Sequence, residues 1–236
     1  VADSRVALAR AAAEYHGHPS RRLRVVGVRG TNGKTVVSFL VRHLLEAAGT
    51  RCGLVGTVRY EGGDRSLPAQ RTTPEAVEIQ KMLAQMVTAG CAACVLEVSS
   101  HALDQHRVEG VAFDVGIFTN LTEDHLDYHG SVEEYYAAKR RLFALLQEGG
   151  KPARAVINID DPFGARLHGE TGAAVRISFG FTESATIRAS RIRLGAEGTT
   201  MRVETPAGAI DCRLPLLGRL NVYNALAAIG TGIVLG

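Results

Sequence analysis

The sequence predicts an α/β fold: a mostly parallel sheet flanked by helices, with a small antiparallel β subsheet near the C-terminus. Three observations predict it. Strand-like and helix-like patterns alternate over most of the chain, which is typical of parallel strands joined by crossover helices. A glycine-rich turn joins the first strand to a helical pattern. After residue 173 the pattern changes to short alternating runs broken by Gly and Pro.

The individual elements follow from the spacing of apolar residues and from turn residues. Helical spacing predicts a short amphipathic helix over residues 4–15, and Gly17 and Pro19 indicate a linker up to residue 22. A turn is expected around Gly62. Strands are expected at 23–28, 52–58, 93–98, 113–119, 153–159, 187–194, 199–204 and 209–214. Further helices are expected at 35–48, 74–89, 132–147, from about 161, and at 221–234.

Composition and charge argue against several classes of protein. The 236 residues are 46% hydrophobic and 22% charged, which is enough to bury a full core. The net charge is only +3 and the basic residues are scattered, which argues against a nucleic-acid surface. No segment approaches the ~18 apolar residues of a membrane span, and no signal peptide is evident. We therefore expect a cytoplasmic protein that binds no nucleic acid and does not insert into a membrane.

The junction of the first strand and the following helix carries the most specific motif. Gly30-Thr31-Asn32-Gly33-Lys34-Thr35 matches a pattern in which backbone amides wrap around a phosphate chain. Lys34 would add a positive charge, and the Thr35 hydroxyl would ligate a phosphate-bound Mg²⁺. The motif indicates a P-loop-type sheet that binds a nucleoside triphosphate. Because Val28 replaces the first glycine of the longer motif, an ordinary Gly-Lys turn is the alternative.

Polar residues follow two further predicted strands, at the sheet edge where ligands gather. Glu97 lies near the end of one strand, and burying its carboxylate would be costly without a cation. We therefore expect Glu97 to bind a metal ion near the phosphates; the alternative is a Glu that faces solvent or pairs with an arginine. After the next strand, His125 lies in a polar cluster with Asp124 and Asp127, without a recognised zinc spacing.

Lys139 occupies an inward position in the helix predicted from residue 132. Steps of three and four residues from Val132 through Tyr135 reach Lys139 before they reach Leu142. Desolvation lowers a lysine pKa, and the free amine can react with CO₂ to give a carbamate that binds metal ions. From periodicity alone, a lysine whose stem packs while its ammonium reaches solvent is the favoured alternative.

Several segments, found in order along the chain, together resemble a known family. They are 30–35 (GTNGKT), 56–60 (GTVRY), 72–75 (TTPE), 97–103 (EVSSHAL), 105–107 (QHR), 119–121 (TNL), 124–130 (DHLDYHG), 137–139 (AAK) and 218–228 (GRLNVYNALAA). On these segments the chain resembles the Mur ligase family, and within it the ligases that add the third residue of the peptidoglycan stem peptide.

The resemblance implies roles for particular residues. The residues implied to bind ATP are Gly30, Thr31, Asn32, Gly33, Lys34, Thr35, Val36, Asn221 and Asn224. The residues implied to hold two Mg²⁺ ions are Thr35, Glu97, His125 and Lys139, the last as N6-carboxylysine. The residues implied to bind the nucleotide-linked dipeptide are Thr72, Thr73, Ser99, Gln105 and Arg107. Lys34, Glu97, His125 and Lys139 would thus form the catalytic centre, and the family evidence reverses the preference stated above for Lys139.

The implied reaction is ATP-dependent amide bond formation in peptidoglycan precursor synthesis. ATP would phosphorylate the free carboxylate of UDP-MurNAc-L-Ala-D-Glu, and a diamino acid, meso-diaminopimelate or L-lysine, would displace phosphate from the acyl phosphate. The two cations and Lys34 would stabilise the charge that develops when a phosphate chain meets a carboxylate. The resemblance implies a monomeric bacterial cytoplasmic enzyme with ATP and Mg²⁺ as cofactors.

Two departures from the family pattern limit this expectation. Val36 stands where the family often has a second hydroxyl residue. Residues 1–22 are expected to be a helix and linker from a preceding domain, and 23–236 a central ATP-binding domain without its C-terminal partner, so turnover by this chain alone is expected to be low. A folylpolyglutamate-synthetase-like ligase and a nucleotide-binding module without catalysis are the alternatives.

Overall fold

The computed structural model describes residues 3–122 and 132–236; within helix α6 it does not describe the side chains of residues 132–135, 138 and 139. The helices are α1 Ser4–Tyr15, the 3₁₀ helix η1 Pro19–Arg22, α2 Lys34–Ala47, α3 Ala76–Thr88, α4 Ser100–Asp104, α6 Val132–Glu148, α7 Pro162–Glu170 and α8 Arg219–Leu235. The strands are β1 Arg24–Arg29, β2 Cys52–Val55, β3 Arg59–Gly62, β4 Arg65–Pro68, β5 Ala93–Glu97, β6 Val115–Phe118, β7 Arg154–Asn158, β8 Val175–Gly180, β9 Ile187–Gly195, β10 Gly198–Thr205 and β11 Gly208–Leu214.

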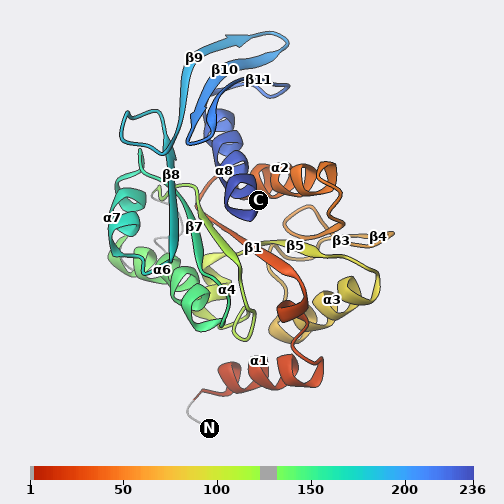
Figure 1. Cartoon of the computed structure of the whole chain (residues 1–236). Coiled ribbons are helices and arrows are strands. Elements are labelled where there is room, and N and C mark those ends of the chain that lie inside the picture. The colour runs from red at the N-terminus through yellow and green to blue at the C-terminus, as the bar shows by residue number, and fades with distance from the viewer. Residues whose placement is uncertain (1–2, 123–131) are drawn as a thin grey trace.

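The described strands form one sheet with the order β11-β10-β9-β8-β7-β6-β1-β5-β2-β3-β4 (Figure 1). The neighbouring strands β8, β7, β6, β1, β5 and β2 run parallel, as the alternating pattern predicted. Strand β1 lies between β5 and β6 at the centre, and all its residues after Arg24 are buried. A parallel strand with helices on both faces is buried throughout, which is why this segment is a continuous apolar run.

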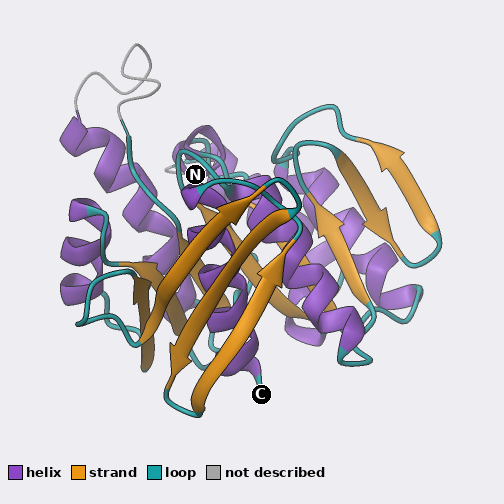
Figure 2. Cartoon of the chain, turned by 90° about the horizontal axis from the view of Figure 1, so that it is seen from above, coloured by secondary structure: helices purple, strands orange, loops and turns teal. Residues whose placement is uncertain are grey.

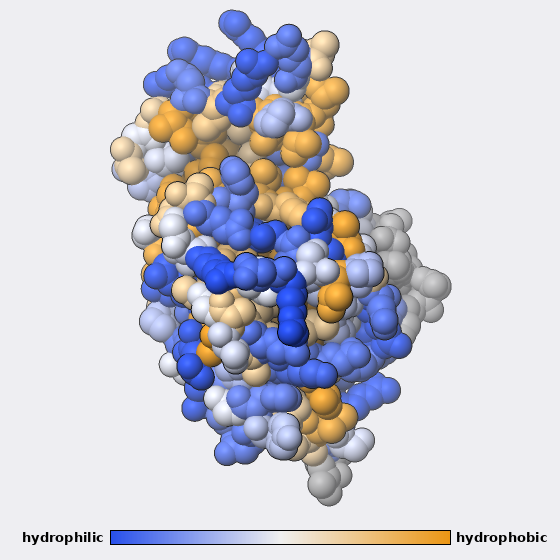
Figure 3. All heavy atoms as spheres, turned by 90° about the vertical axis from the view of Figure 1, so that its right-hand side faces the viewer, coloured by the Kyte–Doolittle hydropathy of each residue, from blue (hydrophilic) through white to orange (hydrophobic). Residues whose placement is uncertain are grey.

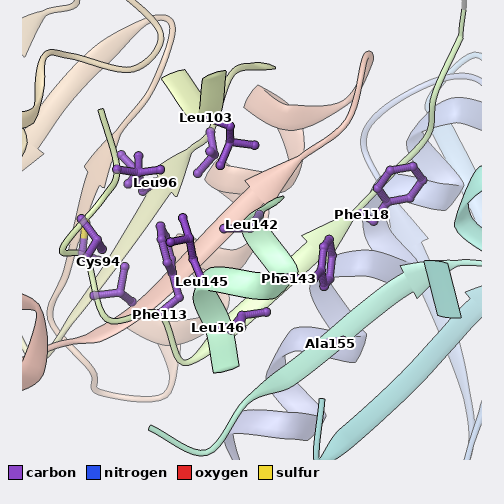
Figure 4. Close-up of a cluster of buried hydrophobic side chains, with 14 of the residues drawn as sticks. Cys94, Leu96, Leu103, Phe113, Phe118, Leu142, Phe143, Leu145, Leu146 and Ala155 are labelled. Carbon is purple, nitrogen blue, oxygen red and sulfur yellow. The ribbon is translucent and has the colours of Figure 1, made fainter. Parts of the chain in front are cut away.

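Two layers of helices cover the two faces of the parallel sheet. Helices α3 and α6 pack on one face, where Val25 of β1 joins their core, and α2 and α8 pack on the other face with Val26 and Val28. Figure 4 shows part of the first core, in which aromatic and aliphatic side chains from the sheet and α6 meet. Gly27 is required there, because a Cβ would lie 2.9 Å from the Phe113 ring.

The two ends of the sheet are antiparallel and much more exposed. The expected antiparallel subsheet near the C-terminus is confirmed as β9–β11, at the opposite edge from the β3–β4 hairpin (Figure 2). Figure 3 shows apolar side chains gathered on the upper part of one face, toward β9–β11. The large exposed apolar residues near this end are Leu194, Ile210, Leu217 and Leu220.

Several expected elements need correction. Strand β8 was not expected, and it extends the parallel part of the sheet. It pairs with β9, with Phe179 opposite Ile187 and Gly180 opposite Arg188. The antiparallel strands therefore continue the main sheet. The turn at Gly62 is confirmed, but its strands β3 and β4 were missed because they are short and, at this edge, exposed enough to lack a strong apolar alternation. The expected strand 52–58 ends at Val55, and the five-residue helix α4 was not expected.

The N-terminal helix is confirmed and packs against this domain. The Asp3 side chain caps it by accepting hydrogen bonds from the backbone N–H groups of Arg5 and Val6, at 2.8 and 3.2 Å. Its buried residues Ala9, Ala12 and Ala13 are small, which allows close approach, and α1 contacts α3. Within the described residues, the helices fall short of the length and apolar character that crossing a bilayer requires.

Candidate active site

The carboxyl ends of β1, β5 and β6 meet at one edge of the sheet. In register, Val28 of β1 lies beside Glu97 of β5 and Ile117 of β6. The predicted phosphate loop follows β1, Ser99 follows β5 and Asn120 follows β6. The sequence-based expectation that these segments share one edge is confirmed, since adjacent parallel strands end on the same side.

Both loop glycines are required by close approach to other elements. A Cβ on Gly30 would lie 1.8 Å from Thr119 Oγ1 at the end of β6. Gly33 has a φ of +88°, and a Cβ there would lie 2.2 Å from Asn224 Oδ1 of α8. The loop is therefore packed between β6 and α8, and helix α2 begins directly after Gly33 with Lys34.

The segment after β6 holds the phosphate loop through side chains and backbone. Asn120 Oδ1 accepts from the Asn32 N–H at 2.9 Å, and the Asn120 carbonyl accepts from the Thr31 N–H at 3.0 Å. Thr119 Oγ1 donates to the Asn32 carbonyl at 2.7 Å. These bonds hold the loop in its conformation. Asn120 directly follows a buried strand, and this position is the sequence signal for a functional role.

Lys34 and Thr35 begin helix α2 at the edge of the loop. The Lys34 ammonium donates to the carbonyls of Gly30 and Thr31, at 3.0 and 2.9 Å, so it lies over the loop. Thr35 Oγ1 donates to Glu97 Oε2 at 3.1 Å. Val36 follows in the first turn of the helix, half-buried and without a hydroxyl.

Glu97 has a fully buried side chain whose described partners are neutral donors. Its Oε2 accepts from Thr35 Oγ1 at 3.1 Å and from Thr57 Oγ1 at 2.9 Å, and its Oε1 accepts from the Thr57 N–H at 3.1 Å. Among the described residues no Lys, Arg or His forms an ion pair with it. A Cβ on Gly56 would lie 2.2 Å from Oε1, so a glycine is required beside this carboxylate. The solvent-facing and arginine-paired alternatives are both wrong for the described structure.

The five residues expected to bind the nucleotide-linked dipeptide form one continuous group. Thr73 Oγ1 donates to the Glu97 carbonyl at 2.7 Å and accepts from the Ser99 N–H at 3.0 Å. Arg107 donates to the Thr73 carbonyl at 3.0 Å and to Gln105 Oε1 at 2.6 Å.

Two further contacts complete this group. Thr72 Oγ1 lies 3.1 Å from Thr57 Oγ1. Glu75 Oε1 lies 3.2 Å from the Arg107 guanidinium, which places an acidic group beside this arginine. The structure thus joins the predicted dipeptide site to the Glu97 carboxylate, and the roles of its residues remain a prediction.

The first turn of α8 lies against the phosphate loop. Asn224 Nδ2 donates to Asn221 Oδ1 at 3.0 Å, and Asn224 is the residue that a Cβ on Gly33 would strike. Beside them Tyr223 stacks on Phe181 with ring centroids 4.2 Å apart. Tyr223 also donates to Asp160 Oδ2 at 2.9 Å; burial and this hydrogen bond raise the pKa of Tyr223 well above its usual value.

Two predicted metal ligands are not tested. His125 lies outside the described residues, as do Asp124 and Asp127. Lys139 lies within α6, but its side chain is not described. Within the described residues, no three His, Cys, Asp or Glu side chains gather as a metal site. Of the four expected metal ligands, the structure brings Thr35 and Glu97 together.

Comparison with known proteins identifies the family. The pattern of the Mur ligase middle domain matches residues 28–232, and the chain belongs to the Mur ligase family. It is 46% identical to the UDP-N-acetylmuramoyl-L-alanyl-D-glutamate–2,6-diaminopimelate ligase of Geobacter metallireducens, over 100% of this chain and 47% of that protein. It is also 46% identical to the UDP-N-acetylmuramyl-tripeptide synthetase of Deinococcus radiodurans, over 100% of this chain and 47% of that protein.

Solved structures agree with this assignment. A UDP-N-acetylmuramoyl-L-alanyl-D-glutamate–2,6-diaminopimelate ligase superposes with a TM-score of 0.83 at 29% identity, over 96% of this chain and 47% of that chain. A folylpolyglutamate synthase from Mycobacterium tuberculosis superposes with a TM-score of 0.74 at 18% identity, over 98% of this chain and 59% of that chain, which shows the fold alone. The chain spans about half the length of the curated relatives it matches.

Proposed function

We propose that this chain is the nucleotide-binding part of an ATP-dependent ligase that adds the third residue to UDP-MurNAc-L-Ala-D-Glu in peptidoglycan precursor synthesis. The observation that carries the proposal is the buried Glu97 carboxylate beside Thr35 at the end of the loop, in contact with neutral donors. The names of relatives 46% identical to this chain support the substrate. Since diaminopimelate occurs in the names of the Geobacter metallireducens relative and of the superposed ligase structure, we propose it as the amino acid added.

The described residues fit a magnesium ion. Mg²⁺ binds oxygen ligands at about 2.1 Å in octahedral geometry, so two neighbouring ligands lie about 3.0 Å apart. Thr35 Oγ1 and Glu97 Oε2 are 3.1 Å apart, and both are hard oxygen donors. When bound, the ion would neutralise charge that develops on the transferring phosphoryl group. A second ion held by His125 and a carbamylated Lys139 completes the proposal.

Other residues of this chain bind and orient the two substrates. The loop amides and Lys34 bind the phosphates of ATP and orient the γ-phosphate. Thr72, Thr73, Ser99, Gln105 and Arg107 hold the nucleotide-linked dipeptide, and the Arg107 guanidinium suits its carboxylates. We assign Asn221 and Asn224, which lie on α8 beside the loop, to binding of the nucleoside.

The proposed reaction has two steps. The dipeptide carboxylate attacks the γ-phosphorus of ATP, and the bond between that phosphorus and the β,γ-bridging oxygen breaks. ADP departs, and the product on the dipeptide is an acyl phosphate. The amine then attacks the acyl carbon, loses a proton, and expels inorganic phosphate to form the amide. No protein nucleophile is needed; positioning and charge stabilisation supply the catalysis.

Amine-dependent ADP formation by the complete protein tests the proposal. With UDP-MurNAc-L-Ala-D-Glu and Mg·ATP, we expect ADP release to depend on meso-diaminopimelate and to be much slower with L-lysine. Lys34→Met should abolish release.

Mg·ATP binding without ADP formation, with any amine, would instead support a nucleotide-binding module without catalysis. Turnover with a folate and glutamate would support the folylpolyglutamate-type alternative. A monomeric state and a cytoplasmic location are part of the proposal and are checked by sedimentation and by fractionation.

Lys139 provides a separate test of the second metal site. We expect Lys139→Ala to lose most ADP formation in the complete protein, and short carboxylates such as acetate to restore part of it by replacing the carbamate. A crystal should show extra density at Lys139 Nζ. An alanine variant with normal turnover would contradict the assignment.

A further inference from the structure

Thr57 lies between the predicted metal site and the predicted dipeptide site. It belongs to the loop that joins β2 to β3, and its side chain is exposed rather than part of the core. Its polar contacts reach both Glu97 and Thr72. Its N–H and its hydroxyl reach the two oxygens of Glu97, at 3.1 and 2.9 Å, and its hydroxyl also lies 3.1 Å from Thr72 Oγ1.

Donor and acceptor counting gives these hydrogen bonds a direction. A carboxylate oxygen only accepts, and a threonine hydroxyl has one proton to donate. Thr57 therefore gives its proton to Glu97, and the Thr72 hydroxyl must donate to Thr57. The chain of donation runs from Thr72 through Thr57 to Glu97, so the orientation of the Thr72 hydroxyl depends on the carboxylate.

The position of the Glu97 carboxylate also depends on this loop. With Thr57 binding both oxygens, the carboxylate plane is held from one side, while Oε2 remains in contact with Thr35. Gly56 allows the close approach, since a Cβ there would lie 2.2 Å from Oε1. A second link runs through the backbone, where Thr73 donates to the Glu97 carbonyl at 2.7 Å.

We propose that Thr57 is a positioning residue that orients Glu97 for the metal ion and couples metal-nucleotide binding to the binding of the nucleotide-linked dipeptide through Thr72. This inference rests on the proposed function of the two sites. An ion held by Oε2 would weaken the acceptance of the Thr57 hydroxyl proton by that oxygen, and through Thr57 it would reorient the hydroxyl of Thr72. Groups that orient metal ligands typically alter metal affinity by about 10- to 100-fold when removed.

Calorimetry on the complete protein tests the positioning role. A non-hydrolysable ATP analogue is titrated at a series of Mg²⁺ concentrations into the wild type, Thr57→Val and Thr57→Ser. We expect Thr57→Val to raise the Mg²⁺ concentration for half-maximal nucleotide binding about 10-fold, and Thr57→Ser to stay within about twofold of wild type, because serine keeps the hydroxyl. The matched control is Thr88→Val, an exposed threonine whose hydroxyl donates to the Ala84 carbonyl of its own helix; it should leave the midpoint unchanged.

The coupling is measured in the same experiment. In the wild type, saturating Mg²⁺ and analogue should change the Kd of UDP-MurNAc-L-Ala-D-Glu by about fivefold or more, and Thr57→Val should remove most of that change. Gly56→Ala should also remove most of that change in Kd, because its methyl group displaces Glu97 Oε1. Thermal unfolding of each variant shows that it is folded.

The outcomes separate this inference from the proposed function. An unchanged Mg²⁺ midpoint in Thr57→Val, with wild-type nucleotide binding intact, would overturn the inference alone. A serine variant as impaired as the valine variant would also overturn it. Absence of Mg²⁺-dependent nucleotide binding by the wild type would overturn both proposals. Binding that shows the expected shifts without ADP formation would uphold the inference and overturn the ligase.

Discussion

Two buried glutamates in this molecule are satisfied in opposite ways. Glu109 follows α4 in a loop, and cations surround it: Arg10 lies 3.0 Å from Oε1, and Arg141 lies 3.3 Å from Oε2. His106 Nδ1 lies 3.6 Å from the same Oε2. Glu97 ends β5, and its described contacts come from hydroxyl and amide groups.

The difference separates a carboxylate that joins elements of the fold from one for which we propose ligand binding. A buried charge that is already paired gains little from another cation and mainly joins elements together. Glu109 joins α1 to α6 in this way. A buried carboxylate bound only by neutral donors keeps its charge available, and a cation placed beside it gains a strong interaction. This contrast supports the proposal that a metal ion binds at the sheet edge beside Glu97.

The largest expected effect is on Glu97. In the complete protein, Glu97→Gln should lower kcat/KM for ADP formation by at least about 100-fold, since even residues behind a metal ligand change activity or affinity by about 10- to 100-fold. Its melting temperature without ligands should stay equal to or above that of wild type, because removing a buried charge that no described cation pairs with costs little. Steady-state kinetics and calorimetric unfolding measure the two values. A variant that is strongly destabilised but catalytically normal would reverse the comparison.

The matched change at the other site is Glu109→Gln. We expect the free energy of unfolding to fall by about 1–2 kcal/mol, because two charge-assisted hydrogen bonds weaken while the exposed arginines remain solvated. The Mg²⁺ dependence of nucleotide binding should not change, since Glu109 belongs to the interface of α1 and α6. Urea unfolding and calorimetry provide the readouts. A shifted Mg²⁺ midpoint would show that the two carboxylates are not separate.

The stability contribution of Glu109 should depend on pH. Burial raises the pKa of Glu109, but hydrogen bonds from Arg10, Arg141 and His106, together with the charge of Arg141, outweigh burial and hold the pKa below its usual value. A lowered pKa means that the contribution is fully present above the ordinary glutamate pKa of about 4.3 and is lost as pH falls below it. The difference in unfolding free energy between wild type and Glu109→Gln should therefore shrink over the acidic interval below about pH 4.3. A constant difference over that interval would contradict this assignment.

The smallest effect is expected at the exposed partner of the same site. The Arg10 side chain is 68% exposed, so water and salt screen its interaction with Glu109. Arg10→Ala should lower the free energy of unfolding by no more than about 0.5 kcal/mol, and less at high salt. Urea unfolding at low and high ionic strength checks this. A loss as large as that of Glu109→Gln would show that Arg10 is the main partner.

Much of the parallel core could be predicted because its signals are local. Long buried strands are apolar runs, and the phosphate loop is a contiguous motif between β1 and α2. Glu97 could be predicted as functional because a charge interrupts such a run. Strands β3 and β4 were missed because short, partly exposed edge strands lack a strong apolar pattern. Helix α4 has only five residues, too few for helical periodicity to be recognised.

The partners of each carboxylate were not predictable from local patterns. Thr57 is separated from Glu97 by 40 residues, and Thr35 by 62 residues. The only sequence signal at Thr57 is the Gly-Thr pair directly after a buried strand. Glu109 showed no sequence signal at all, since its partner Arg10 is 99 residues away in α1.

The sequence by itself determined the types of most elements, the phosphate loop and the presence of a charge at the end of β5, because backbone preference and apolar periodicity act over a few residues. The tertiary structure decided what surrounds that charge. The strand order β1-β5-β2 places Glu97 between the loop after β1 and the loop after β2, so Thr35 and Thr57 reach it from opposite sides. Helix α1 lies beside the loop after α4, so Arg10 of α1 reaches Glu109. Long-range packing thus assigns one buried carboxylate to the proposed ligand site and the other to structure.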